Sequence, residues 1–260
     1  MTTEIRTRWF ADRLGLESPI GVLLMLVFLS GCSTTWEPVT QSAPVQRGTE
    51  PIPFFIGTYT DAGSEGIYRS AVLGPDRLAV PSLAVNSQNP SFLALDPDGR
   101  FLYSVNEIAD FEGQTAGSVS SFEVLDDGTL RPLNIQPSGG RGPCHLTLDA
   151  ESRWLAVANY GGGSTALLEV QEDGSLASPS SVIRHEGSSV NRARQSEPHA
   201  HCVGFNSDGS RLYSADLGTD EILIYDIREG RLTEASPRAL RLKPGAVSYT
   251  HLRAHETKAN

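Results

Sequence analysis

The sequence has 260 residues, long enough for one large β domain or two domains of average size. Its formal net charge of −10 argues against nucleic acid as a partner, because phosphate binding needs clustered Lys and Arg side chains. The 25 Gly and 16 Pro, against 2 Met, indicate a turn-rich, strand-rich protein rather than a helical one.

The N-terminus has the pattern of an export signal. Arg6, Arg8 and Arg13 precede an apolar run at 19–29, which is too short to cross a bilayer comfortably. Basic residues, a short apolar core and small residues are typical of a secretory signal. The letters LSGC that end at Cys32 resemble the bacterial lipoprotein box. We therefore predict lipidation of Cys32 and a place in the cell envelope, on its periplasmic or extracellular face. An ordinary signal with a chance cysteine is the alternative.

The rest of the chain divides into three parts. Residues 33–52 are polar, contain Pro and lack periodicity, so we expect a disordered tether. Residues 53–246 carry the repeating pattern of the folded domain. Residues 247–260 lack that pattern and resemble translated sequencing adapter, so we expect a non-native tail and further repeats missing from the chain. His251 and His255 lie in this tail, and we do not count them as metal ligands.

Short strands recur in four sets from Phe54 onward. We expect them at 54–59, 66–72 and 77–84; at 91–95, 101–105, 117–124 and 129–135; at 145–149, 153–158, 164–170 and 175–183; and at 201–205, 211–215, 221–227 and 231–236. Asp-Gly or Glu-Gly turns separate the last two strands of each later set. Matching positions recur about every 55 residues, which suits a four-stranded propeller blade. The sequence predicts an all-β fold, a β-propeller with about four blades in this chain.

Several motifs occur in a fixed order along these sets: FFIGTYT from Phe54, LYSVNE from Leu102, GPCHLTLD from Gly142, VANYGGGS from Val157, RQSEPHAHCVGF from Arg194 and ADLGTDEILIY from Ala215. On these motifs the chain resembles the lactonase family of seven-bladed β-propellers. That family includes bacterial 6-phosphogluconolactonases and fungal carboxy-muconate lactonising enzymes. The resemblance implies seven blades in the full-length protein and chemistry without a metal or cofactor. It also implies a further Arg-His motif in the next blade, where this chain departs into its tail.

Opening a lactone with water needs a base and donors for the developing oxyanion. Histidine suits the first role because it titrates near neutrality, and arginine suits the second. His145, Arg194 and His199 fall at blade starts or in the loop leading into one, so we predict them as catalytic residues. The resemblance favours His145 as the base. The alternative for His145 is a packing role on an inner strand, because the matching positions in the other blades hold Phe92 and Cys202.

The same mouth of the propeller is expected to hold the groups that bind the substrate. We predict this role for four residues: His201, Glu107, Tyr160 and Asn159. For strand-end residues such as Asn106 and Asp216 we favour turn capping and hydrogen bonding between blades.

Two alternatives concern metal and sulfur chemistry. His199 and His201 share one face of an extended strand, which leaves zinc binding open. Because no clear carboxylate or thiolate ligand set accompanies them, and because the resemblance implies metal-free chemistry, we predict no metal. Cys144 and Cys202 fall in adjacent columns of neighbouring repeats, and a disulfide between them is a minor alternative.

These features predict a lipid-anchored, monomeric lactonase that hydrolyses a sugar-type lactone. An unphosphorylated aldonolactone suits an exported protein better than 6-phosphogluconolactone, which is made in the cytosol. One alternative is the reverse chemistry, lactonisation of a carboxy-muconate-like dicarboxylate. The other is a non-catalytic propeller that serves as a binding scaffold in the envelope.

Overall fold

A computed structural model describes residues 50–245 and the backbone of residues 26–28. Cys32, most of the predicted signal and tether, and the tail with His251 and His255 lie outside the described residues. The part of the chain that is described forms strands, turns and loops, and it contains no helix long and apolar enough to cross a membrane.

The described strands form four antiparallel sheets, which confirms the all-β prediction. The first sheet contains β1 (Leu26–Phe28), β2 (Ile52–Ile56), β3 (Gly66–Gly74), β4 (Arg77–Leu78) and β5 (Ser82–Asn86). The second contains β6 (Leu93–Leu95), β7 (Phe101–Asn106), β8 (Ser118–Val124) and β9 (Leu130–Pro137). The third contains β10 (Pro143–Leu148), β11 (Trp154–Asn159), β12 (Ser164–Glu169) and β13 (Ser181–Arg184). The fourth contains β14 (Ala200–Phe205), β15 (Arg211–Asp216), β16 (Glu221–Arg228) and β17 (Arg231–Arg241).

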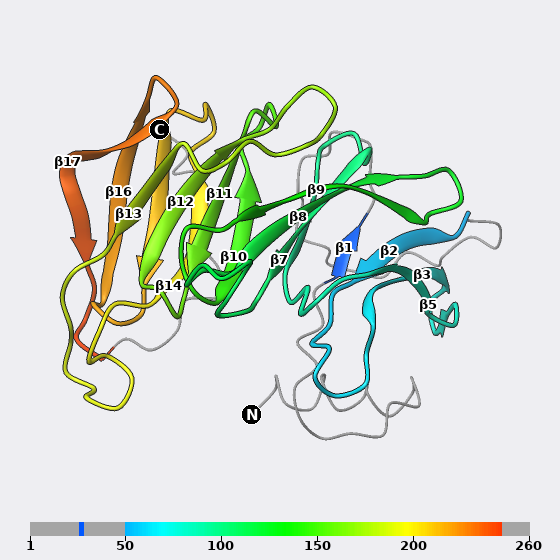
Figure 1. Cartoon of the computed structure of the whole chain (residues 1–260), viewed down its shortest axis with the longest axis horizontal. Helices are drawn as coiled ribbons and strands as arrows, with labels where there is room; N and C mark the ends of the chain where they lie inside the picture. Colours follow the sequence, from blue (N-terminus) through cyan, green and yellow to red (C-terminus); the bar gives the residue numbers. More distant parts are fainter. Residues whose placement is uncertain (1–25, 29–49, 246–260) are drawn as a thin grey trace.

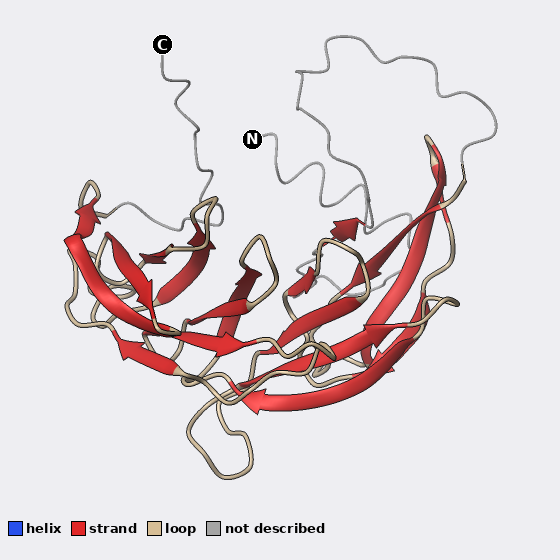
Figure 2. Cartoon of the chain, turned by 90° about the horizontal axis from the view of Figure 1, so that it is seen from above, coloured by secondary structure: helices blue, strands red, loops and turns tan. Residues whose placement is uncertain are grey.

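Each of the last three sheets is a simple meander in which every strand pairs with the next one in sequence. The sheets follow one another along the chain, and in Figures 1 and 2 they stand side by side on a curved arc. This is the arrangement expected of successive propeller blades.

The apolar core lies between neighbouring sheets. One cluster joins the first and second sheets through Phe55, Leu93 and Phe122, which are almost fully buried. Two further clusters join the second sheet to the third and the third to the fourth. Burying a side chain of this size contributes roughly 1.5–3 kcal/mol, so each sheet is stabilised mainly by its neighbours.

Two expected strands differ from the observed ones. The strand expected at 175–183 is reduced to β13, preceded by an isolated bridge between Val170 and Leu176. Pro179 interrupts it, because proline has no N–H to donate to a ladder. The strand expected at 77–84 is divided into β4 and β5 on either side of Pro81 for the same reason.

β1 falls within the apolar run that the sequence predicts as part of the signal. Its backbone pairs antiparallel with β2, with Leu26 opposite Ile56 and Phe28 opposite Phe54. It therefore lies beside β2 as β6, β10 and β14 lie beside the second strands of their own sheets.

Candidate active site

The predicted site residues lie on the first two strands of their sheets or in the loops beside those strands. One backbone hydrogen bond recurs in three sheets, from the residue after the second strand to a residue in the loop before the first. Glu107 N donates to Asn89 O, Tyr160 N to Gly142 O, and Leu217 N to His199 O. Glu107 and Tyr160 thus occupy matching positions after β7 and β11. His199, before β14, occupies the position that Asn89 and Gly142 hold in the second and third sheets.

His199 is held by Tyr160 of the preceding sheet. Its ring stacks on the Tyr160 ring, with centroids 4.4 Å apart and planes 12° from parallel. The Nδ1 atom is 3.0 Å from the Tyr160 carbonyl oxygen, to which it donates. In the neutral imidazole this places the lone pair on Nε2, which is the atom that a general base uses.

His201 also contacts Tyr160, through an edge-on arrangement with centroids 5.7 Å apart. The pairing of β14 with β15 shifts register between Ala200 and Cys202, so His201 sits at a bulge. The pairing of β10 with β11 shifts in the same way between Pro143 and His145. Such bulges redirect side chains and are common beside active sites.

His145 packs among side chains of the neighbouring inner strands. Its ring is 4.1 Å from that of Phe92, and its Nε2 is 3.6 Å from Cys202 Sγ. The backbone N–H of Val203 donates to Nδ1 at 3.4 Å. When Nδ1 accepts, neutral His145 carries its proton on Nε2, which is the opposite tautomer to that of His199. These contacts match the packing alternative, and the role of His145 as base stays a prediction.

Glu107 directly follows β7 in the second sheet, and its carboxylate accepts hydrogen bonds from two hydroxyl groups. Its Oε2 accepts hydrogen bonds from the Tyr59 hydroxyl at 2.8 Å and from Ser91 Oγ at 2.6 Å. Burial and the hydrogen bond to Glu107 raise the pKa of Tyr59, so the phenol stays protonated and donates. Sequence analysis missed Tyr59 as a site residue, although the FFIGTYT motif contains it.

Asn159 and Arg194 lie in contrasting surroundings. The Asn159 side chain is fully buried, and its Nδ2 donates to Ser138 O at 2.9 Å and to Ser164 Oγ at 3.2 Å. Arg194 is exposed in the loop between β13 and β14. That loop is fastened by buried Gln195, whose Nε2 donates to Leu217 O at 2.8 Å.

A second arginine that sequence analysis missed lies beside Tyr160. Arg141 leads into β10, and its Nη2 donates to Gly161 O at 3.0 Å. The sequence could have pointed to Arg141, because it precedes GPCH in the same kind of loop that carries Arg194 before PHAH.

The two described cysteines are free thiols, so the minor alternative of a disulfide is wrong. Cys144 Sγ donates to His201 O at 3.5 Å. Burial and the nearby charge of Glu107 raise the pKa of the Cys144 thiol. Among the described residues, no three His, Cys, Asp or Glu side chains are placed to hold one metal ion.

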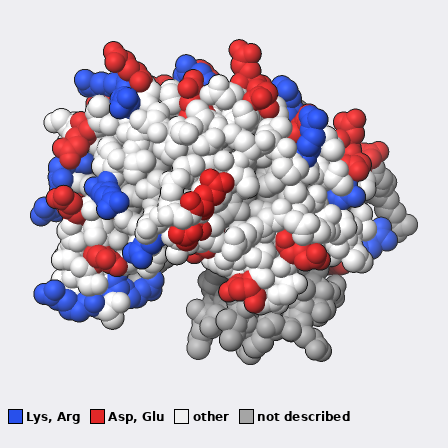
Figure 3. All heavy atoms as spheres, in the orientation of Figure 1, with Lys and Arg blue, Asp and Glu red and all other residues white. Residues whose placement is uncertain are grey.

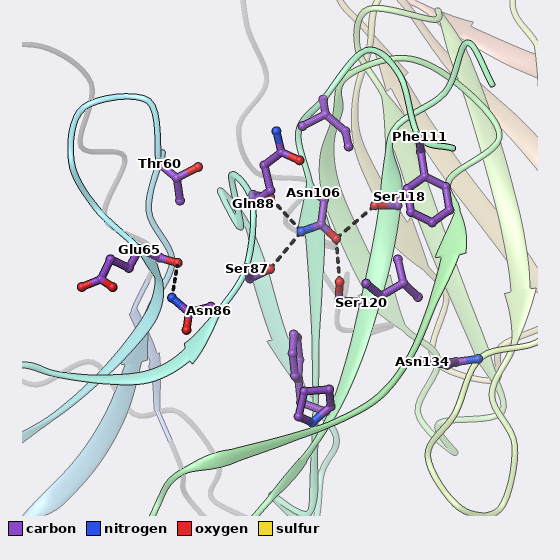
Figure 4. A pocket seen from close by; sticks show the side chains of 14 residues that line it. Thr60, Glu65, Asn86, Ser87, Gln88, Asn106, Phe111, Ser118, Ser120 and Asn134 are labelled. Carbon is purple, nitrogen blue, oxygen red and sulfur yellow. Dashed lines mark hydrogen bonds between the residues drawn. The ribbon is translucent and has the colours of Figure 1, made fainter. Parts of the chain in front are cut away.

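A separate pocket of about 510 Å³ opens between the first and second sheets (Figure 4). Phe111 and Phe122 line it together with polar side chains, among them Asn106. None of the residues that line it is a histidine. We therefore place the candidate active site at the histidines and not in this pocket.

Charged side chains of both signs are scattered over the face shown in Figure 3, and uncharged groups cover most of its centre. Lys and Arg side chains gather along the lower left edge of that face (Figure 3).

The sheets and the site together define a class of protein: a β-propeller with histidine, tyrosine and glutamate side chains gathered where successive sheets meet. Residues 53–252 match the family model described as "Lactonase, 7-bladed beta-propeller". The chain belongs to this family, which confirms the resemblance seen in the sequence.

Individual relatives agree with the family model. The chain is 36% identical over 195 residues to a 6-phosphogluconolactonase of Bacillus subtilis (strain 168), covering 74% of this chain and 53% of that protein. It is 32% identical over 162 residues to a 6-phosphogluconolactonase of Formosa agariphila, covering 61% of this chain and 45% of that protein. The solved structure of a Pseudomonas aeruginosa periplasmic gluconolactonase superposes with a TM-score of 0.68 at 33% identity. The match covers 74% of this chain and 56% of that one. The chain spans about half the length of the curated relatives it matches.

Proposed function

We propose that this protein hydrolyses a sugar-type lactone, as its 6-phosphogluconolactonase relatives are named for doing. The observation that carries the proposal is the arrangement of His199, whose Nδ1 is committed to the Tyr160 carbonyl while Nε2 holds the lone pair. Family membership supplies the reaction class, and the ring of His199 supplies a base suited to it.

In the proposed reaction His199 removes a proton from water as the water oxygen bonds to the lactone carbonyl carbon. The carbonyl oxygen gains negative charge, which a positioned arginine such as Arg194 stabilises. The bond between that carbon and the ring oxygen then breaks, and the ring oxygen takes the proton and leaves as a hydroxyl. His145 is the second candidate for the base.

Substrate contacts are assigned to residues around this base. His201 and Tyr160 adjoin His199, and Glu107 presents a carboxylate that can accept hydrogen bonds from sugar hydroxyls. Asn159, buried beside Tyr160, supports the strand end from which Tyr160 projects.

We further propose that the substrate is an unphosphorylated aldonolactone and that the protein is a monomer, exported and anchored through a lipid on Cys32. The signal-like N-terminus supports this location. Likeness to a protein named as a periplasmic gluconolactonase supports both the location and the substrate.

The test compares the 260-residue chain on glucono-δ-lactone and on 6-phosphogluconolactone, each corrected for spontaneous hydrolysis. The proposal expects turnover of the unphosphorylated lactone, and expects it to fall to background in His199→Gln. Hydrolysis restricted to the phosphorylated lactone would overturn the substrate assignment. Turnover of a carboxy-muconate without lactone hydrolysis would replace the proposal by the lactonising alternative.

A further inference from the structure

Polar side chains join neighbouring sheets at the same end as the candidate site. At the first junction Asn106, the last residue of β7, donates from Nδ2 to Ser87 Oγ at 2.9 Å and to Gln88 O at 2.7 Å (Figure 4). At the second junction Asn159, the last residue of β11, donates from Nδ2 to Ser138 O at 2.9 Å. Both junctions are made of uncharged groups.

The third junction holds an ionisable pair at the same positions. His185 matches Ser87 and Ser138, because all three follow the last strand of a sheet and donate their backbone N–H to the loop before its third strand. Asp216 ends β15 as Asn106 ends β7. His185 Nδ1 lies 2.6 Å from Asp216 Oδ2, and both side chains are 0% exposed.

The His185 ring is fixed on its other side as well. Its Nε2 is 2.9 Å from Thr165 Oγ1, which is 2.7 Å from Ser214 Oγ. Because hydroxyls both donate and accept, this pair of side chains satisfies the ring whether or not Nε2 carries a proton. The ring therefore holds the Asp216 carboxylate in one orientation.

The second carboxylate oxygen reaches the candidate site. Asp216 Oδ1 accepts from the backbone N–H of His199 at 2.9 Å and from that of Thr219 at 3.0 Å. Hydrogen bonds to an ionised acceptor are stronger than neutral ones, so this carboxylate fixes the backbone from which the His199 ring projects.

The two asparagines make no such contact with the residue that leads into the first strand of their own sheet. Asn106 Oδ1 accepts from Ser118 and Ser120, whereas the backbone N–H of Asn89, the residue that matches His199, donates to Thr60. Asn159 Oδ1 meets no donor among the described residues. Among these three junctions, the link from the end of the second strand to the residue before the first strand is therefore found at the one that carries His199.

We propose that His185 and Asp216 are a positioning pair that sets the orientation of the His199 ring. His185 orients the carboxylate, Asp216 holds the His199 backbone, and the Tyr160 carbonyl then selects the Nδ1–H form of the ring. The inference rests on the proposed function in taking His199 as the base, but the geometry it predicts is measurable without any substrate.

The test uses the full chain labelled with ¹⁵N-histidine, and it reads the two ring nitrogens of neutral His199, identified by their loss in His199→Gln. Wild type is expected to show protonated Nδ1 and unprotonated Nε2. In Asp216→Ala the two nitrogen shifts should converge, because the ring samples both tautomers. Asp216→Asn retains an acceptor for the His199 N–H and should restore most of the separation.

The control is Ser87→Ala, which removes a hydrogen bond from the first junction and should leave the His199 shifts unchanged. Lactone turnover should fall about a hundredfold in Asp216→Ala and be largely rescued in Asp216→Asn, since small displacements of a reacting group carry costs of that order.

Unchanged His199 nitrogens in folded Asp216→Ala would overturn the proposal. If that variant does not fold, Thr165→Val replaces it, because this change of similar shape releases the far side of the His185 ring and the Ser214 hydroxyl while leaving Asp216 in place. Unchanged His199 nitrogens there would overturn the proposal equally. Converging shifts in a chain whose wild type hydrolyses no lactone would support the positioning pair while removing the proposed function.

Discussion

The imidazole of His199 lies almost parallel to the phenol ring of Tyr160, with centroids 4.4 Å apart. The two residues belong to different sheets, since Tyr160 follows β11 and His199 precedes β14. The candidate base is therefore fixed by a contact between sheets, and its geometry depends on how the third and fourth sheets pack.

Removal of the Tyr160 ring should weaken the site without unfolding the sheets. A stacked aromatic pair contributes about 0.5–1.5 kcal/mol, so we expect lactone turnover by Tyr160→Ala to fall by up to about tenfold. Tyr160→Phe keeps both the ring and the backbone carbonyl that accepts from His199, and it should retain more turnover than Tyr160→Ala. Steady-state kinetics of both variants checks this; equal losses would show that the hydroxyl matters and not the stack.

Gly218 lies against the loop that delivers His199. A Cβ at Gly218 would overlap the carbonyl oxygen of Glu197 and press on Pro198. Gly218→Ala should displace this backbone and destabilise the fold by about 1–3 kcal/mol, the usual cost of overpacking. Gly74→Ala is the matched control, because a Cβ there meets no atom within 4 Å. Urea unfolding of the two variants measures the difference, and equal midpoints would contradict the assigned contact.

The Asp216 carboxyl should make the fold sensitive to acid. Burial by itself would raise the pKa of Asp216, but the hydrogen bond and charge of His185, with the N–H groups of His199 and Thr219, hold it below its usual value. A carboxyl with a lowered folded pKa stabilises the protein above its unfolded pKa of about 3.9. That stabilisation is lost as the pH falls below this value and through the folded pKa.

Wild type should therefore lose stability more steeply than Asp216→Asn as the pH is lowered through this range. Urea midpoints from about pH 6 to about pH 3 provide the measurement. Parallel curves for the two proteins would show that Asp216 does not titrate as the structure predicts.

The Cys144 thiol should react slowly with alkylating reagents while the protein is folded. Its raised pKa leaves little thiolate at mildly alkaline pH, and the thiolate is the reactive form. Unfolding in urea should restore the reactivity of an ordinary cysteine. Mass spectrometry of iodoacetamide-treated protein checks this at residue level, and rapid labelling of folded protein would contradict the assigned burial.

The repeat pattern predicted the sheets well because the alternation of apolar and polar residues along a strand and the turn residues between strands are local signals. It also placed Glu107 and Tyr160 at matching positions after the second strands of two blades, and His199 in the loop before the first strand of the next blade. Strand irregularities were harder to foresee: β13 is short because Pro179 interrupts a run that otherwise reads as extended.

His185 was missed because nothing local distinguishes it. It follows a short edge strand in a polar stretch, and its role arises from Asp216, a residue far along the chain in the next sheet. The predicted preference of Asp216 for bonding between blades agrees with the structure. Its partner became visible only in the structure, which brings the residue after β13 to the end of β15.

Lactone hydrolysis by the full chain and by His199→Gln tests the central claim most directly. Both proteins are assayed on glucono-δ-lactone in a pH-stat, with the spontaneous rate subtracted and folding verified by urea unfolding. We predict turnover by wild type and a rate at background for His199→Gln. Equal turnover by the two folded proteins would contradict the assignment of His199 as the base.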